Sequence, residues 1–369
     1  MLGLSGCGGS GTSSGQQGGG ARLEAAQKAL RDLRGKVLST GPYGEKPTPK
    51  SRVELTDEEL EQIKAKGATA AISMHYGGND WAKGQIDGLQ SQFGKMGMEV
   101  IAITDATFDP NKQVSDIENI LIEKPDVMVS IPTDGLATAD AYGKAVDQGV
   151  KLVFMDNVPV GFKHGEDYVS VVSADNYGNG VASAHIMALN LGGRGKIGLV
   201  YHAADFFVTQ QRYEGFKKTL RSDYKRIEIV EEQGVIGPDF ASEAMLAASA
   251  MITKHADLDG IWAVWDVPAE GVLAAARTVD RTGLSVTTCD LGEPVAISIA
   301  SGGMVRGLGS QRPFEQGLTE ATLGGYGLLG KKAPAYVALP ALPVMERNVL
   351  DAWRIAYHKA PPSKVSQVA

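Results

Sequence analysis

The sequence has few of the features by which several classes of protein are recognised. It contains no run of about 18 apolar residues, so we expect no membrane-spanning helix. Its 36 basic residues form no cluster and are outnumbered by 43 acidic ones, which argues against nucleic-acid binding. The six histidines lack metal-ligand spacing, and no P-loop, G-x-S-x-G or H-E-x-x-H motif occurs. We therefore expect no metal, no cofactor and no catalysis.

What is present is the composition of an ordinary globular protein. The hydrophobic fraction is 43% and the charged fraction 21%, so a core can form without covalent staples. The chain has 369 residues, whereas a typical domain has roughly 100–200. We expect two lobes and an extension.

The two cysteines lie far apart, and the first has an unusual setting. Cys7 ends the run Leu4-Ser5-Gly6-Cys7 and precedes a Gly/Ser-rich stretch. This tetrad resembles a bacterial lipobox, in which the cysteine is lipidated, and the stretch suits a flexible tether over 1–20. Because no apolar segment precedes Cys7, this interpretation requires a start upstream of Met1; an ordinary disordered tail is the alternative. Lipidation would leave Cys289 without a disulfide partner.

Residues 21–67 predict a helical extension. Leu23, Ala26, Leu30 and Leu33 recur at helical spacing up to Gly35. A linker rich in proline and glycine follows over 40–51. Thr56 and Glu59 then form the capping box of a second helix.

From residue 68 onward, short apolar runs alternate with amphipathic stretches of about 12–18 residues. This alternation indicates βαβ units, and about nine strands are too many for one typical sheet. We predict an α/β fold of two doubly wound parallel-sheet lobes, with 170–172 as a crossover. The predicted strands are Ala68–Met74, Val100–Ile103, Val127–Ile131, Leu152–Met155, Ile197–Val200, Ile227–Val230, Gly260–Ala263, Ser285–Thr288 and Val305–Leu308.

Ligands of open parallel sheets bind beyond the carboxyl ends of the strands. The residues there combine aromatic rings with carboxylates, amides and an arginine. Rings can stack on the C–H faces of a sugar, while the polar groups pair with its hydroxyls. This mixture predicts a neutral, polyhydroxylated ligand.

An ordered set of short motifs resembles the type I periplasmic sugar-binding proteins, which include the ribose- and galactose-binding proteins. The resemblance covers roughly residues 68–344. Its landmarks, none of them specific alone, are Asn79-Asp80-Trp81, Ile131-Pro132-Thr133-Asp134, Phe154-Met155-Asp156-Asn157, Ser173-Ala174-Asp175-Asn176, Arg212-Tyr213-Glu214-Gly215-Phe216, Trp265-Asp266, Cys289-Asp290 and Gly309-Ser310-Gln311.

The resemblance implies ligand-binding roles for His75, Asn79, Trp81, Asp156, Asn157, Arg212, Trp265, Asp290 and Gln311, and a hinge at Ser173, Asp175 and Asn176. Three positions depart from the pattern of ribose binders. Ile131 replaces a polar amide, Asn157 an arginine and Trp265 an asparagine. The cleft is thus more aromatic and less cationic, which favours a polyol or another aldose or ketose over ribose.

The resemblance further implies the solute-binding protein of an ABC importer, which captures a tetritol, pentitol, pentose or hexose by hinge closure. We expect a monomer outside the cytoplasm, anchored through Cys7, with a membrane permease as partner. The expected lobes are 68–174 with 312–341, and 175–311 with 342–369.

Three alternatives remain open. A sensor that feeds a receptor kinase has the same sequence features. A regulator of the lactose-repressor type requires a helix-turn-helix, but the linker between the two predicted helices is too long for one. An α/β enzyme would turn over the bound sugar.

Overall fold

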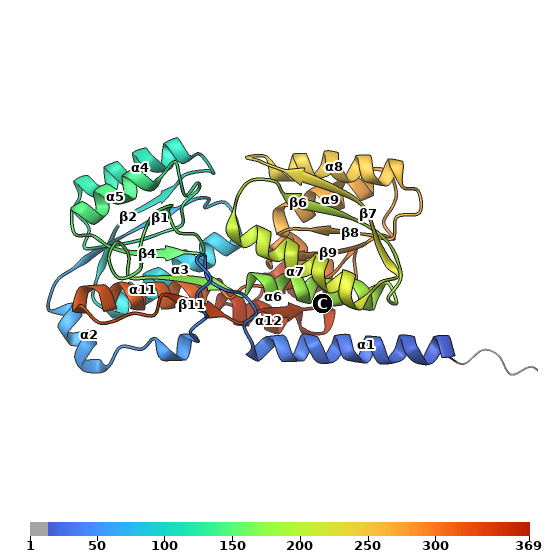
Figure 1. Cartoon of the computed structure of the whole chain (residues 1–369), viewed down its shortest axis with the longest axis horizontal. Helices are drawn as coiled ribbons and strands as arrows, with labels where there is room; N and C mark the ends of the chain where they lie inside the picture. Colours follow the sequence, from blue (N-terminus) through green and yellow to red (C-terminus); the bar gives the residue numbers. More distant parts are fainter. Residues whose placement is uncertain (1–13) are drawn as a thin grey trace, which may run out of the picture.

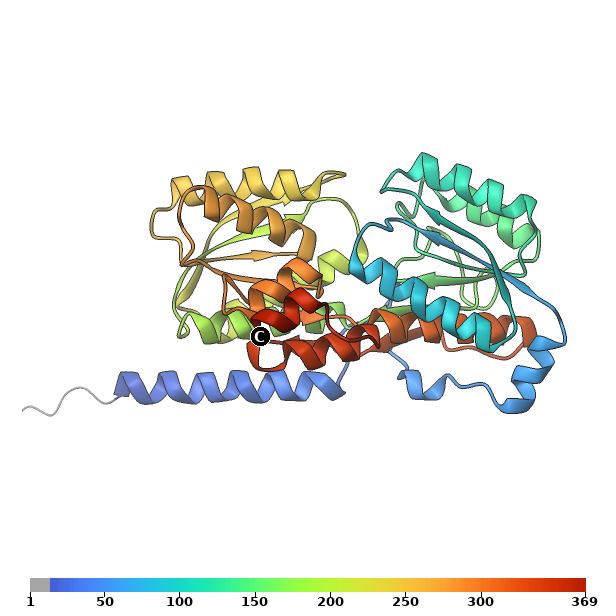
Figure 2. The same cartoon turned by 180° about the vertical axis from the view of Figure 1, so that it is seen from behind.

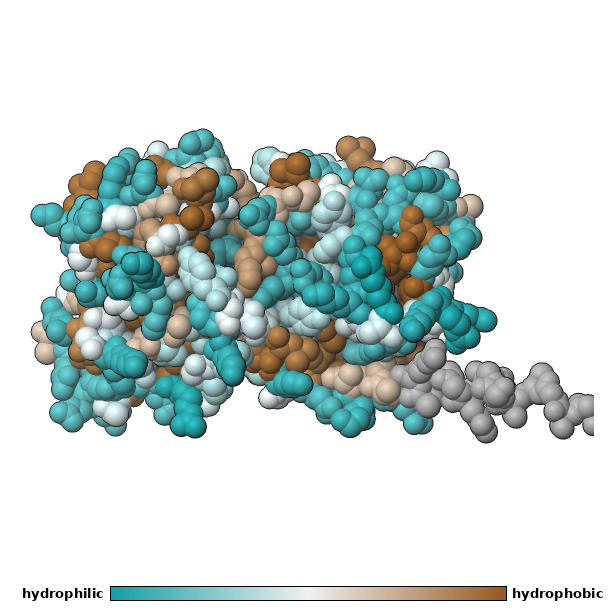
Figure 3. Space-filling view, in the orientation of Figure 1, coloured by the Kyte–Doolittle hydropathy of each residue, from teal (hydrophilic) through white to brown (hydrophobic). Residues whose placement is uncertain are grey.

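The computed structural model describes residues 14–369 and contains two α/β lobes side by side, which confirms the predicted fold class (Figure 1). Cys7 lies outside the described residues. No helix of the described part has the length and apolar character needed to cross a membrane. On the face shown in Figure 3, apolar residues are interspersed among hydrophilic ones on both lobes.

The N-lobe is built on a parallel six-stranded sheet in the order β11-β5-β4-β3-β1-β2. Its helices cover both faces, with α3 and α11 on one and α4 and α5 on the other. The bounds are β1 (Thr69–Met74), α3 (Asp80–Lys95), β2 (Glu99–Asp105), α4 (Pro110–Ile122), β3 (Val127–Ser130), α5 (Ala139–Asp147), β4 (Lys151–Met155), β5 (Ser170–Ala174), α11 (Pro313–Leu329) and β11 (Tyr336–Leu339).

The C-lobe repeats this plan with the strand order β12-β10-β9-β8-β6-β7. All its pairs are parallel except β10 with β12. The bounds are α6 (Asn176–Asn190), β6 (Gly195–His202), α7 (Phe207–Asp223), β7 (Ile227–Val235), α8 (Phe240–Lys254), β8 (Gly260–Ala263), α9 (Asp266–Thr278), β9 (Ser285–Cys289), α10 (Glu293–Ala300), β10 (Val305–Ser310), β12 (Leu342–Val344), α12 (Val349–Tyr357) and α13 (Ser363–Val368).

The chain crosses between the two sheets three times, at 174–176, 310–313 and 339–342. The first and third crossings are joined by a hydrogen bond from the Asp175 N–H to the Leu339 carbonyl, 2.8 Å long. Residues 170–172, predicted only as a crossover, form part of strand β5 because they complete the N-lobe sheet between β4 and β11.

The extension lies against both lobes (Figures 1 and 2). Helix α1 (Ser14–Asp32) runs along the C-lobe, where Leu30 and Leu33 pack on α6. Helix α2 (Asp57–Lys64) packs on the N-lobe, and its Thr56–Glu59 capping box is present as predicted. Short 3-10 turns follow α1 (Leu33–Gly35) and precede α2 (Lys50–Arg52).

Helix α1 begins at Ser14, whereas residues up to 20 were predicted to form a flexible tether. The prediction followed from Gly18, Gly19 and Gly20, because glycine lowers helix stability by about 1 kcal/mol per residue. The helix nevertheless includes these three glycines.

Candidate functional site

A cavity of about 60 Å³ lies between the lobes at the carboxyl ends of their strands, where ligands of open parallel sheets bind. Every sequence-predicted ligand residue lines it except Asn157. The cavity is lined by His75, Tyr76, Asn79, Trp81, Phe108, Ile131 and Asp156 from the N-lobe, and by His202, Phe206, Val208, Thr209, Arg212, Trp265, Asp290 and Gln311 from the C-lobe side.

Two aspartates occupy equivalent positions in the lobes. Asp156 directly follows β4 and Asp290 directly follows β9, and both have left-handed backbone conformations with φ of 56° and 64°. That conformation is uncommon for residues other than glycine and concentrates at functional sites. At these two positions it ends the strand abruptly and leaves the carboxylate at the cavity.

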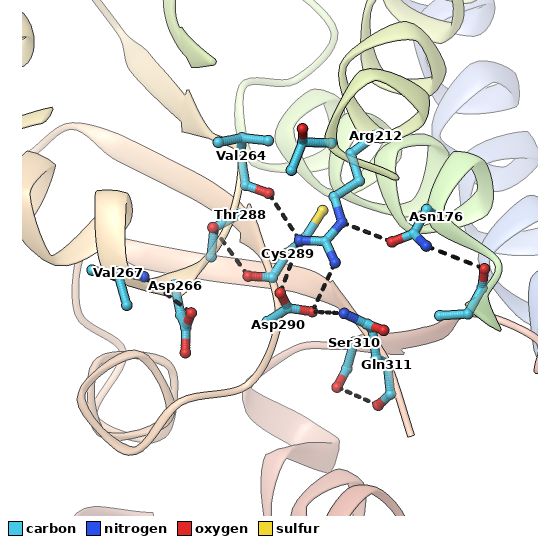
Figure 4. A network of polar contacts seen from close by, with 12 residues as sticks. Asn176, Arg212, Val264, Asp266, Val267, Thr288, Cys289, Asp290, Ser310 and Gln311 are labelled. Atoms are coloured by element: carbon cyan, nitrogen blue, oxygen red, sulfur yellow. Dashed lines mark hydrogen bonds and ion pairs between the residues drawn. The ribbon is translucent and has the colours of Figure 1, made fainter. Parts of the chain in front are cut away.

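Arg212 is positioned by close packing of α7 on α6. Gly180 and Gly215 lack the Cβ atoms that would clash with Arg212 O and Tyr177 O, at 2.0 and 2.3 Å respectively. The guanidinium then donates to Asp290, with Nη1 2.8 Å from Oδ2, and to Asn176 Oδ1, 2.8 Å from Nε (Figure 4). The ion pair is buried on both sides.

The network extends from this ion pair to both ends of the cavity. Gln311 donates to Asp290 Oδ1 at 3.0 Å, as Figure 4 shows. Asn176 donates to Ser173 Oγ, which in turn donates to Asp156 Oδ1 at 2.5 Å. The predicted hinge residues Ser173 and Asn176 thus connect a C-lobe arginine to an N-lobe carboxylate.

Burial changes the ionisation of several lining groups. Desolvation raises the pKa of Asp156 to about 6, opposed by the bond from Ser173. Desolvation lowers the pKa of His75 to about 3 and that of His202 to about 4, so both rings are uncharged at neutral pH. Among the residues that line the cavity, the positive charge therefore comes from Arg212, and Asp290 neutralises it.

Several buried polar atoms at or beside the site have no hydrogen-bond partner in the part of the chain that the structure describes. They are His75 Nδ1, Trp81 Nε1, Gln311 Oε1 and both amide atoms of Asn157. Unpaired buried polar groups are costly, and those lining the cavity are available to a ligand. Asn79 differs, because its Oδ1 accepts from Ala82 N and caps α3.

Aromatic rings form the rest of the wall. Trp265 meets Phe240 edge-on with ring centroids 4.8 Å apart, and His202 lies 5.5 Å from Trp265. His75 stacks with Phe206 at 5.8 Å. Phe108, Phe206 and His202 line the cavity although no motif distinguished them. The sequence signal for His202 and Phe206 was their place after the predicted strand Ile197–Val200; in the structure His202 is the last residue of β6 and Phe206 follows that strand.

Cys289 and Asp266 are buried beside the network (Figure 4). Desolvation raises the pKa of the Cys289 thiol to about 12, so this free cysteine is protonated. Desolvation also raises the pKa of Asp266 well above its usual value. Within residues 14–369, no group of three or more His, Cys, Asp or Glu side chains is arranged to hold a metal ion.

Comparison with known proteins gives a consistent result. The family model of the periplasmic binding protein domain matches residues 70–324. The ribose import binding protein of Bacillus subtilis is 28% identical over 192 residues, which is 52% of this chain and 59% of that protein. The D-ribose/D-allose-binding protein of Pseudomonas aeruginosa is 28% identical over 49% of this chain and 56% of that protein. The chain thus spans less than two thirds of these relatives.

Solved structures match over a longer span. An ABC transporter solute-binding protein from Agrobacterium vitis, bound with α-D-tagatopyranose, has a TM-score of 0.72 at 21% identity, covering 79% of this chain and 100% of that one. A second protein from the same organism, with bound allitol, has a TM-score of 0.67 at 22% identity, covering 78% and 99%. These structures support the two-lobed fold.

Proposed function

Because the chain belongs to the periplasmic binding protein domain family, we propose that it captures a neutral sugar or sugar alcohol between its lobes for an ABC importer. The observation that carries this proposal is the cavity wall, in which buried aromatic rings alternate with hydroxyl-pairing groups. The relatives named for ribose and allose, and the neighbours with bound tagatose and allitol, support the same ligand class.

Charge argues for a neutral ligand. Arg212 is paired with Asp290, and the two histidines that line the cavity are uncharged. An anionic ligand would find no unpaired cation among the described lining residues. A polyol or sugar instead matches unpaired donors and acceptors such as Trp81 Nε1 and Gln311 Oε1.

The mechanism is lobe closure without a chemical step. A ligand that touches both lobes stabilises the closed form over the open one, and closure excludes water from its hydroxyl contacts. The closed protein, a monomer, then docks on a membrane permease. Family membership favours a location outside the cytoplasm, and Cys7 is the proposed lipid anchor.

A thermal-shift screen tests the proposal. The purified protein is heated with pentoses, hexoses, deoxysugars and four- to six-carbon polyols, each at millimolar concentration. A ligand at 100 times its dissociation constant stabilises the folded state by about 2.7 kcal/mol. We expect one compound to raise the melting temperature and its epimers not to do so. If no compound in the panel does, the proposed ligand class is wrong.

A further inference from the structure

The two lobes exchange aromatic residues across the cleft. Phe108, which follows strand β2 of the N-lobe, packs on the hydrophobic core of the C-lobe. Phe206 and Val208, which follow strand β6 of the C-lobe, belong to the hydrophobic core of the N-lobe. This structure therefore contains a reciprocal apolar contact between the lobes, made by side chains that are not part of the polar network.

Phe108 is held in place by a strained turn. Thr107 and Phe108 both have left-handed backbone conformations, with φ of 52° and 61°. A β-branched residue such as threonine rarely adopts this conformation, which is strained and persists only where surrounding contacts impose it. Here Asp105 Oδ1 accepts from Thr107 N at 2.8 Å, and the Phe108 N–H donates to the His75 carbonyl at 2.7 Å.

The strained turn places the ring of Phe108 between the two lobes. Phe108 stacks on Tyr76 of its own lobe, with centroids 5.1 Å apart, and meets Phe240 of the other lobe edge-on at 5.0 Å. Phe240 is the first residue of α8 and is buried in the C-lobe core. Aromatic pairs of this geometry are stabilising beyond the apolar area that they bury.

We propose that Phe108 and Phe206 form a reciprocal aromatic latch that holds the lobes closed. Phe108 acts as a positioning residue, because its contact with Phe240 holds the C-lobe in place. Trp265, which belongs to the same lobe, is thereby held against the cavity. This proposal rests on the proposed function in one respect, namely that lobe closure retains the ligand. The closed state itself can be measured in protein without a ligand.

The test measures the distance between the lobes in ligand-free protein. Spin labels at Leu136→Cys and Leu246→Cys, exposed residues on opposite lobes, report this distance by electron-electron resonance in a Cys7→Ser background. We expect Phe108→Ala to shift the distribution to longer distances, and Ile122→Ala, at an exposed N-lobe position, to leave it unchanged.

Pairing with Phe240 is tested in the same way. We expect Phe240→Ala to open the lobes and Phe108→Ala/Phe240→Ala to open them no further than either single change. The Phe108 ring is only half-buried, and an unchanged distance distribution in folded Phe108→Ala overturns the latch. Failure of every sugar to bind would overturn the proposed function but leave this result standing.

A second, independent observation concerns the extension. Residues 36–49, which we call the strap, connect α1 on the C-lobe to the N-lobe sheet (Figure 2). The strap lies outside the segment that matches the family model. It makes a fourth connection between the lobes in addition to the three crossings.

The strap is bonded directly to the first crossing. Both carboxylate oxygens of buried Asp175 accept from the strap: Oδ2 from Leu38 N, and Oδ1 from Ser39 N and Ser39 Oγ, each at 2.9 Å. Ser39 Oγ also accepts from Tyr177 N at 2.9 Å. Nine residues after Ser39, Thr48 bridges to β11: its N–H donates to the Tyr336 carbonyl, and its own carbonyl accepts from the Ala338 N–H.

We infer that the strap limits how far the lobes can open. One end is fixed to the C-lobe and the crossing, and the other to the edge of the N-lobe sheet. Rotation of the lobes must therefore stretch the short exposed turn between them, at Tyr43 and Gly44. The strap would limit opening whether or not a ligand is bound.

Cutting the strap tests this inference while keeping every native residue. A protease site inserted between Tyr43 and Gly44 allows the same labelled protein to be measured before and after cleavage. We expect cleavage to broaden the interlobe distances toward longer values. Ser39→Ala should do so to a smaller extent, whereas Ser51→Ala, at an exposed site beyond the strap, should not. Identical distributions before and after cleavage would overturn the inference.

Discussion

The two walls of the cavity differ in how their polar groups are satisfied. On the C-lobe wall, Arg212, Asp290 and Gln311 bond to one another and to Asn176 in the crossing. On the N-lobe wall, His75 Nδ1 and Trp81 Nε1 have no hydrogen-bond partner among the residues that the structure describes. On the C-lobe wall most polar groups are thus bonded within the fold and Gln311 Oε1 is left unpaired, whereas on the N-lobe wall two ring nitrogens are left for a ligand. We therefore expect substitutions on the C-lobe wall to change mainly the free energy of unfolding, and substitutions on the N-lobe wall to change mainly the affinity for the ligand.

Breaking the C-lobe ion pair should have the largest effect. Asp290→Ala leaves the buried guanidinium of Arg212 without its counter-charge, which costs about 3–5 kcal/mol of folding free energy. Urea unfolding of the ligand-free protein measures this loss. The matched control is the double change Arg212→Met with Asp290→Leu, which removes both charges and should recover much of the stability. If Asp290→Ala lowers the free energy of unfolding by less than about 1 kcal/mol, the ion pair is not part of what stabilises the fold.

His75 should make the N-lobe sensitive to acid. The folded state keeps this ring neutral because burial lowers its pKa to about 3, whereas the unfolded chain takes up the proton near pH 6.5. The unfolded state therefore binds more protons below pH 6.5, and the free energy of unfolding falls as the pH falls. His75→Gln should remove about 2 kcal/mol of the loss between pH 7 and pH 5. If the free energy of unfolding depends on pH in the same way for the wild-type protein and for His75→Gln, His75 is not the source of the acid sensitivity.

Trp81→Phe should affect binding and leave folding intact. The change removes the unpaired indole N–H but keeps an aromatic ring, so we expect the free energy of unfolding to stay within about 0.5 kcal/mol or to rise. Affinity for the sugar found in the screen should fall by about 1 kcal/mol, roughly five- to tenfold, as measured by calorimetry. Trp353→Phe, in α12 away from the cavity, is the control and should not alter affinity.

The sequence predicted most of the fold because the apolar runs of buried parallel strands are long and distinct. Strands β11 and β12 were not predicted, since they have four and three residues and no helix between them. Their pairing depends on the two lobes meeting at the third crossing, which is a tertiary property. The same holds for β5, whose identity as a strand depends on its neighbours β4 and β11.

The site was predictable where it follows strand ends. Asp156, Asp290 and Gln311 lie directly after strands, and the cavity lining includes them. Phe108 was not predictable, because its ring reaches the cavity through a left-handed turn that no local pattern indicates. The bonds from Ser39 to Asp175 span 136 residues and join an extension to a crossing, so no short motif indicates them.

The exchange of aromatic residues between the lobes has a thermal consequence. When the lobes separate, Phe108, Phe206 and Phe240 become exposed to water, and when they close around a ligand this apolar surface is buried again. Burial of apolar surface lowers the heat capacity, so the enthalpy of ligand binding should become steadily more negative as temperature rises. The protein would then release more heat on binding its ligand at a higher temperature than at a lower one.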